Sequence, residues 1–160
     1  MRVFLTITIG LLASFLIVYC SSSTTRTSEI ASFPADDLHG LVAADKVEID
    51  HQNSSDGKGS LRIVTDKPTV IELYQLDDID IEDALLVYQA ELKTAGIAGQ
   101  VYLEMWCHFP GLGEFFSRGL NDPLTGNTDW TSAATPFILK QGQNPDRVRL
   151  NLVIDGRGTA

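Results

Sequence analysis

Residues Gln100–Leu120, QVYLEMWCHFPGLGEFFSRGL, limit how this chain can fold more than any other segment. Apolar and polar residues alternate over the first nine positions, and a Gly-rich stretch that keeps three aromatic residues follows. Alternation with a period of two predicts a half-buried β-strand, and the break after it predicts a long, structured loop at the end of a sheet. Four side chains suited to binding lie on the polar side of this strand: Tyr102, Glu104, Trp106 and His108.

Seven short runs of strand-like composition follow one another between Val47 and Ile154. They read VEID, SLRIV, TVIELYQL, ALLVYQAELK, QVYLEMWCHF, WTSAATPFIL and RVRLNLVI, and pieces rich in turn-forming residues separate them. No stretch has a convincing helical period. The pattern predicts one all-β domain over residues 45–160, an antiparallel β-sandwich of jelly-roll type.

The alternation also predicts which strands pair. Each of the segments Leu85–Lys93 and Gln100–His108 carries a row of apolar residues on one face. The rows are Leu86, Tyr88, Ala90 and Leu92 on the first segment, and Val101, Leu103, Met105 and Cys107 on the second. A hairpin about the Thr94–Gly99 loop places every inward residue opposite an inward partner, and a slip of one residue would destroy this match.

The C-terminal part of the chain suggests either a truncated sequence or a sandwich that lacks its last strand. Arg147–Ile154 supplies another inward apolar row, and the sequence Asp155-Gly156-Arg157-Gly158 is typical of a turn that launches a returning strand. No such strand follows before Ala160. We therefore expect unpaired backbone along Arg147–Ile154.

The N-terminal residues predict export. Arg2 precedes eighteen uncharged, mostly apolar residues, which is the layout of a signal peptide or, at this length, of a membrane anchor over residues 1–20. Residues 21–44 are rich in Ser and Thr and predict a flexible tether. We expect the globular domain to lie outside the cytoplasm, either secreted or membrane-anchored.

Cys20, at the end of the apolar run, resembles the acylated cysteine of bacterial lipoproteins, although Tyr19 stands where that pattern has a small residue. Two interpretations follow: lipidation of Cys20, or a cysteine that belongs to an ordinary signal sequence. In either case Cys107 is left without a partner for an intrachain disulfide.

The formal net charge is −9, and it becomes −10 without residues 1–20 because they hold one base and no acid. A domain this acidic repels phosphates, so nucleic acid and anionic membrane surfaces are excluded as partners of the globular part. Any membrane contact is expected through the N-terminal segment.

Strand order and composition over about residues 46–158, with the closing RVRLNLVIDGRGT, resemble the galactose-binding-like and carbohydrate-binding-module jelly-roll β-sandwiches of secreted or envelope-associated bacterial proteins. The resemblance implies noncatalytic ligand binding, commonly to glycans and often with a structural calcium. It carries no single motif that transfers residue by residue.

The candidate ligand-binding residues are Tyr102, Glu104, Trp106 and His108, joined by Gln89, Arg149 and Asn151 if their strands are neighbours. Aromatic rings stack on the apolar face of a sugar, and polar side chains hydrogen-bond its hydroxyl groups. In the competing interpretation, the 109–127 loop or the tether covers this face and Trp106 only packs.

The segment 109–129 is expected to be a long loop that covers apolar surface at the end of the sandwich. Its large apolar side chains, expected to be tucked against the sandwich, are Phe115, Phe116, Leu120 and Leu124. Glu114 and Arg118 are spaced for a local ion pair, and Arg118 alternatively reaches Glu104.

Five carboxylates within Asp77–Asp83 suit either a calcium site or, as we prefer, a solvated acidic connection. The three histidines show no metal-ligand spacing, and the chain has no phosphate-binding loop or serine elbow. The sequence therefore assigns no cofactor and disfavours an enzyme.

Together these patterns predict an exported, envelope-tethered, noncatalytic binding module for carbohydrate. The alternative is a protein-interaction or structural module of the cell envelope, in which the same aromatic side chains meet a partner protein. A broad exposed apolar patch would favour that alternative.

Overall fold

The computed structural model describes residues 27–160, and Cys20 and the predicted leader lie outside them. The elements are the 3₁₀ turn η1 (Ala44–Lys46) and the strands β1 (Glu48–Asp50), β2 (Ser60–Arg62), β3 (Val64–Thr65), β4 (Thr69–Asp77), β5 (Ala84–Phe109), β6 (Gly113–Arg118), β7 (Leu124–Leu139) and β8 (Arg147–Thr159). The predicted all-β class is confirmed. In the described part of the chain, no helix is long and apolar enough to cross a membrane.

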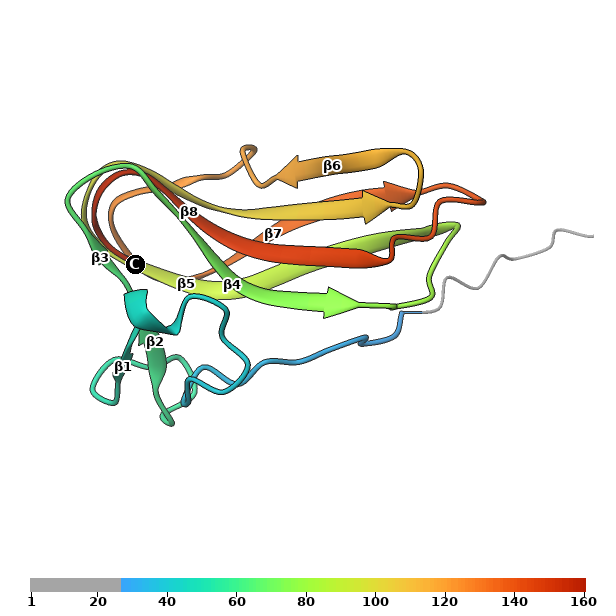
Figure 1. Ribbon diagram of the computed structural model, residues 1–160. Coiled ribbons are helices and arrows are strands. Elements are labelled where there is room, and N and C mark those ends of the chain that lie inside the picture. Colours follow the sequence, from blue (N-terminus) through green and yellow to red (C-terminus); the bar gives the residue numbers. More distant parts are fainter. Residues whose placement is uncertain (1–26) are drawn as a thin grey trace, which may run out of the picture.

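β5 is one bent strand of 26 residues that belongs to both layers of an antiparallel sandwich. It runs along one layer, curls around at the end of the domain and returns in the other layer (Figure 1). Its first half pairs with β7, and its second half pairs with β8 and β6. Because β4 pairs with the other side of β8, one layer has the order β4–β8–β5–β6.

The predicted hairpin between Leu85–Lys93 and Gln100–His108 is wrong, although the two segments do fold back on each other. The first segment takes its hydrogen-bond partners from β7, and the second takes them from β8 and β6. Leu86 and Met105 nevertheless belong to one core cluster. Two apolar rows meet equally well as neighbours in a sheet or across facing layers, and alternation does not distinguish the two arrangements.

The Asp155–Gly158 segment continues β8 and is not the predicted turn. Gly156 pairs with Gly99, which lies in the middle part of β5. The ribbons of β5 and β8 curl together at one end of the domain (Figure 1). A Cβ atom on Gly156 would lie 2.1 Å from the carbonyl oxygen of Ala98, and φ of Gly156 is +154°. Only glycine allows two backbones to approach this closely. The glycines that suggested a turn therefore form a corner of the sandwich.

β8 has hydrogen-bonded neighbours on both sides, so the expected unpaired edge along Arg147–Ile154 is wrong. β4 pairs with one side of this stretch and β5 pairs with the other. At the other end of β8, Ala160 and Ile63 exchange two backbone hydrogen bonds of 2.8 and 3.0 Å. β8 is thus an interior strand of its layer.

The segment 109–129, predicted to be a loop, contains the strand β6 and the start of β7. Phe115, Phe116 and Leu120 are 50%, 51% and 48% exposed, so their predicted burial is wrong, whereas Leu124 is buried as predicted. β6 pairs with β5 on one side only. A strand at the border of a layer leaves both of its faces partly uncovered, which is why neighbouring aromatic residues are exposed together.

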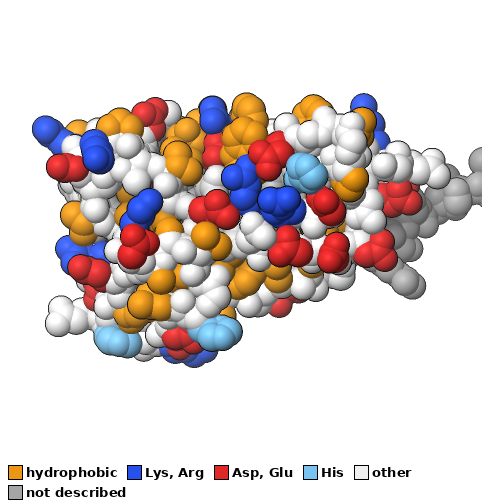
Figure 2. All heavy atoms as spheres, in the orientation of Figure 1, with side chains coloured by type: hydrophobic (Ala, Val, Ile, Leu, Met, Phe, Trp, Pro, Cys, Tyr) orange, Lys and Arg blue, Asp and Glu red, His pale blue; other side chains and the backbone are white. Residues whose placement is uncertain are grey.

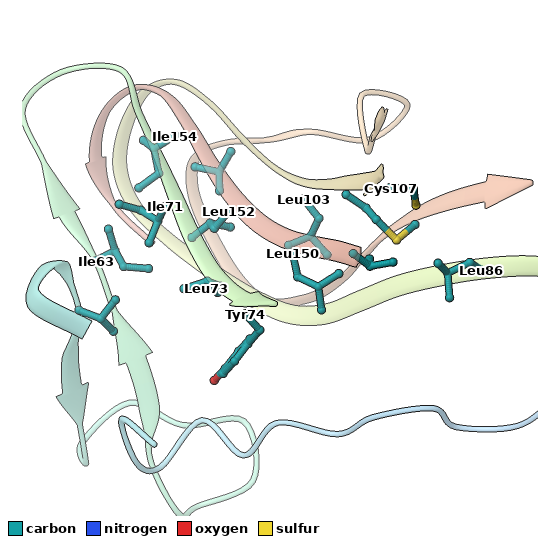
Figure 3. Packing of buried hydrophobic residues seen from close by; sticks show 14 of the residues in the cluster. Ile63, Ile71, Leu73, Tyr74, Leu86, Leu103, Cys107, Leu150, Leu152 and Ile154 are labelled. Carbon is teal, nitrogen blue, oxygen red and sulfur yellow. The ribbon is translucent and has the colours of Figure 1, made fainter. Parts of the chain in front are cut away.

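One hydrophobic cluster fills the space between the layers. Figure 3 shows Ile71, Leu103 and Leu150 in this core, contributed by β4, β5 and β8. Phe33, in the segment before β1, stacks on Tyr74 with ring centroids 3.9 Å apart. Part of the predicted tether thus contacts the sandwich, and its flexibility stays a prediction.

Cys107 lies in this core without exposed surface, and burial raises the pKa of its thiol to about 12. Because the thiolate is the reactive form, Cys107 is expected to be inert toward aromatic disulfide reagents at about pH 8 in the folded protein. In a Cys20→Ser chain it should react only after unfolding in guanidinium chloride, measured by release of the coloured thiolate. Rapid reaction of the folded protein would contradict this expectation and show that the core opens readily.

Candidate functional site

An open hollow of about 680 Å³ lies on the outer face of the β4–β8–β5–β6 layer. Its floor consists of side chains that point away from the core: Val70 and Glu72 of β4, Arg149, Asn151 and Val153 of β8, Tyr102, Glu104 and Trp106 of β5, and Arg118 of β6. Residues 42–46 add one wall. Basic, acidic and apolar side chains gather in the middle of the face shown in Figure 2, over the same strands.

The strand register aligns four of these side chains in a row across the layer. Glu72 pairs with Asn151, and Asn151 pairs with Glu104. Glu104 in turn pairs with Arg118. Each of the four stands at an outward position, because side chains alternate between the two faces of a strand. Polar residues that are far apart in the sequence therefore meet in one floor.

Glu104 holds this floor together. It is 3% exposed and accepts hydrogen bonds from Trp106 Nε1 at 2.7 Å, Asn151 Nδ2 at 3.0 Å and Arg118 Nε at 2.6 Å. Burial by itself raises the pKa of the Glu104 carboxyl, but these donors and the Arg118 charge outweigh burial and keep that pKa below its ordinary value. Glu104 is therefore an ionised anchor for three neighbouring side chains.

Trp106 is a half-buried ring held from three sides. Its Nε1 donates to Glu104, and its ring centroid lies 4.9 Å from that of Phe116 on β6. The guanidinium carbon of Arg149 lies 5.6 Å from the Trp106 ring centroid, within the range of a cation–π contact. These contacts fix the orientation of the ring while part of it faces the hollow.

Both arginines of the floor have carboxylate partners. Arg149 bonds to Glu114 at 2.8 Å and lies 3.9 Å from Glu72. Arg118 bonds to the buried Glu104, so the predicted alternative is confirmed and the local pair with Glu114 is wrong. The lining therefore carries little net charge for a surface with so many ionised groups.

Two polar groups in the floor keep unused bonding capacity. Asn151 Oδ1 is buried and has no hydrogen-bond partner among the described residues, while its Nδ2 is occupied by Glu104. Tyr102 lines the hollow with a hydroxyl group that reaches solvent and has no partner among the described residues. A buried group such as Asn151 Oδ1 gains most from a ligand that supplies the missing partner.

The structure brings five of the seven predicted ligand-binding residues into the hollow: Tyr102, Glu104, Trp106, Arg149 and Asn151. His108 lies outside its lining, with Nδ1 2.5 Å from Asp146 Oδ1. Gln89 is exposed on the first half of β5, opposite Ala134 of β7. Gln89 is absent from the hollow because the hairpin that was expected to bring it there does not form.

The sequence analysis missed the contributions of β4 and of residues 42–46. Glu72 stands between the inward residues Ile71 and Leu73, so alternation alone places it on an outer face. No feature of the sequence indicates that β4 lies beside β8. Asp45 and Lys46 reach the wall of the hollow because Val42 N bonds to Leu73 O at 2.9 Å, which ties their segment to β4.

The interpretation of Trp106 as a covered packing residue is correct in part. Phe116, from the segment expected to cover this face, does contact the Trp106 ring. Residues 42–46 border the hollow without filling it. Trp106 thus packs against Phe116 and also lines the hollow.

The acidic segment Asp77–Asp83 folds against the turn that precedes β8. Asp80 Oδ1 accepts a bond from Asn144 Nδ2 at 2.9 Å, and Glu82 accepts one from the backbone of Gly142. Among the described residues, no group of three or more His, Cys, Asp or Glu side chains is placed to hold a metal ion. In this structure the segment is a connection between strands held by hydrogen bonds.

No protein-family model matches the chain, and no curated protein sequence matches it. Among solved structures, the chain is similar to one described as "Family 16 Carbohydrate Binding Module-2", with a TM-score of 0.50 and 13% sequence identity. The match covers 71% of this chain and 78% of that chain. The predicted resemblance to carbohydrate-binding modules is thereby confirmed for the fold, and the more specific jelly-roll assignment stays a prediction. The described chain is an antiparallel β-sandwich whose fold is similar to that of this solved carbohydrate-binding module.

Proposed function

We propose that this protein is a noncatalytic carbohydrate-binding module and that its hollow binds the sugar. The observation that carries the proposal is the Trp106 ring, fixed by Glu104, Phe116 and Arg149 in a polar hollow of about 680 Å³. A sugar ring has an apolar C–H face that stacks on an aromatic ring, and its hydroxyl groups both donate and accept hydrogen bonds. A ring held in place loses little conformational entropy when a ligand binds.

The polar groups around Trp106 suit an uncharged, hydroxyl-rich ligand. Asn151 Oδ1 lacks a donor, and the Tyr102 hydroxyl lacks a partner, among the described residues. Arg149 is already paired with Glu114 and so offers no strong field for an anion. Direct hydrogen bonds and those carried by water are both available to a sugar at such a surface.

The carboxylates of the hollow support a noncatalytic role. A glycosidase needs an acid with a raised pKa beside a second free carboxylate. Glu104 has a lowered pKa and gives its oxygens to three donors of the protein. Glu72 and Glu114 both lie beside Arg149. Glu72, Glu104 and Glu114 therefore offer no suitable pair for acid–base chemistry.

The proposal also places the protein outside the cytoplasm, secreted or held to the cell envelope through its first 44 residues. Its support is the uncharged run that ends at Cys20, followed by the Ser/Thr-rich segment. Lipidation of Cys20, or retention of residues 1–20 as a membrane anchor, would hold the protein to the envelope, whereas cleavage of an ordinary signal peptide would release it.

A Trp106→Ala variant tests the function. Loss of the stacking surface is expected to weaken binding by about 1.5–3 kcal/mol, roughly 10- to 150-fold, on the glycans that the unaltered protein binds on an array. Trp130→Ala is the matched control, since Trp130 is a half-buried tryptophan of β7 that does not line the hollow. Equal losses in both variants would point to general unfolding, and circular dichroism of each variant separates that case.

A protein partner is the second candidate function, and the exposed aromatic residues of β6 favour it. Phe115 and Phe116 are each about half exposed, at 50% and 51%, beside Leu112 at 62%. If the unaltered protein bound no glycan on the array, the carbohydrate proposal would fall and this apolar patch would become the leading candidate.

A further inference from the structure

A second, smaller hollow of about 230 Å³ adjoins the first one. It lies just beyond the end of β6, between the chain at 119–122 and residues 132–136 of β7. Tyr102 and Arg118 line both hollows, so the two spaces lie on either side of these two side chains. The lining of the smaller hollow adds residues that have no part in the first, among them Asn121 and Asp122.

Small residues create this second space. The backbone N–H of Gly119 donates to Leu103 O at 2.9 Å, which draws the chain close to the end of the layer. A Cβ atom on Gly119 would lie 2.9 Å from Ala134 O, so the chain passes β7 at a distance that a larger residue would disturb. β7 contributes Ser132, Ala134 and Pro136 to the lining, and none of these fills the space.

The side chains at the junction have free hydrogen-bonding groups. Arg118 bonds to Glu104 through Nε, and no described residue bonds to its two terminal nitrogens. Its side chain is 39% exposed. Tyr102 lines both hollows, and its solvent-accessible hydroxyl group has no partner in the described part of the chain. A planar guanidinium with free donors, next to a free hydroxyl group, suits a ligand that crosses from one hollow to the other.

We propose that the two hollows form one groove whose ligand is a carbohydrate chain, with successive sugar units on both sides of Tyr102 and Arg118. This inference rests on the proposed function and adds the length of the ligand. One water needs roughly 15 Å³ of such space, so the smaller hollow, at about 230 Å³, has room for a group much larger than a water molecule. Affinity then rises with chain length until both hollows are filled.

Ala134→Leu tests the groove, because Ala134 lines the smaller hollow and not the one that contains Trp106. Gln89→Leu is the matched control, since Gln89 is exposed, pairs with Ala134 in the sheet and lines neither hollow. The probes are dimers to hexamers of β-1,4-linked glucose, mannose and N-acetylglucosamine, measured by titration calorimetry on the full chain. Asn121→Ala, in an exposed turn, repeats the test without added volume in case Ala134→Leu does not fold.

The unaltered protein is expected to bind hexamers about tenfold more tightly than dimers, a gain of about 1.4 kcal/mol. Ala134→Leu should bind dimers normally and hexamers no more tightly than dimers, and Gln89→Leu should match the unaltered protein. Asn121→Ala should weaken hexamer binding alone. If Ala134→Leu and Asn121→Ala left the gain with length intact, or weakened dimers as much as hexamers, the groove would be refuted while the proposed function stood. If the unaltered protein bound no probe of any length, the proposed function would fail and the groove with it.

Discussion

Gly156→Ala is expected to destabilise the protein by roughly 2–6 kcal/mol, because it combines overpacking with strained backbone. The new Cβ atom would lie 2.1 Å from Ala98 O and 2.9 Å from the Cα of Gly99. Both contacts are with backbone, which cannot move aside as the end of a flexible side chain can. This loss is a large part of the total free energy of unfolding, which is about 5–15 kcal/mol for a typical protein domain. Urea unfolding followed by circular dichroism measures it.

Gly142→Ala is the control for this corner. Gly142 has φ of +79°, but nothing lies within 4 Å of the position its Cβ would take. Its replacement should therefore cost only the strain of a left-handed residue, about 1–2 kcal/mol. Similar losses for the two variants would mean that the close approach of β5 and β8 at Gly156 contributes little.

Glu104→Ala is expected to have the second largest effect, a loss of about 2–4 kcal/mol in the free energy of unfolding. The change leaves Trp106 Nε1 and Asn151 Nδ2 without their acceptor and Arg118 without its buried counter-charge. Removal of one partner from a fully buried pair costs about 3–5 kcal/mol, and the loss here is smaller because the Arg118 side chain is 39% exposed and can turn to solvent.

Glu114→Ala is the matched control for Glu104. Glu114 also bonds an arginine, Arg149, at 2.8 Å, but the two side chains are 38% and 29% exposed. An exposed pair of this kind contributes about 0–1 kcal/mol. Comparison of the two variants distinguishes the buried carboxylate of Glu104, with its three donors, from an ordinary surface ion pair. Equal losses of stability would contradict the role assigned to Glu104.

Glu104 also makes stability depend on pH. The pKa of Glu104 is lower in the folded protein than its ordinary value of 4.5, so its contribution is complete above about pH 4.5 and is lost as pH falls through the folded pKa. The free energy of unfolding should therefore decrease more steeply in acid for the unaltered protein than for Glu104→Gln. Parallel acid unfolding curves for the two proteins would contradict this linkage.

Alternation along the strands predicted correctly which side chains share a face. Leu103 and Met105 point to the core, and Glu104 and Trp106 line the outer hollow. Apolar side chains must leave water, and the pleat assigns successive residues to opposite faces, so this information is local. The same logic placed Arg149 on the outer face, where it is found.

Alternation did not predict which strands pair with each other. Backbone hydrogen bonds form between the same groups whatever the side chains are, so β5 pairs with β7 and β8 without a signal in its own sequence. The corner at Gly156 looked like a turn for a similar reason. A glycine is required wherever backbone conformation or close approach excludes a side chain, and only the neighbouring chain shows which applies.

The sequence by itself determined the all-β class, the two faces of β5 and of the first part of β8, and the candidate aromatic residue Trp106. Only the tertiary structure decided that Glu72, Asn151, Glu104 and Arg118 form one row, and that Tyr102 and Arg118 stand between two hollows. The physical reason is the range of the interactions involved. The alternation of apolar and polar residues, which indicates the buried face, can be seen along a single strand. A binding surface is instead assembled from several strands, and their order depends on the whole fold.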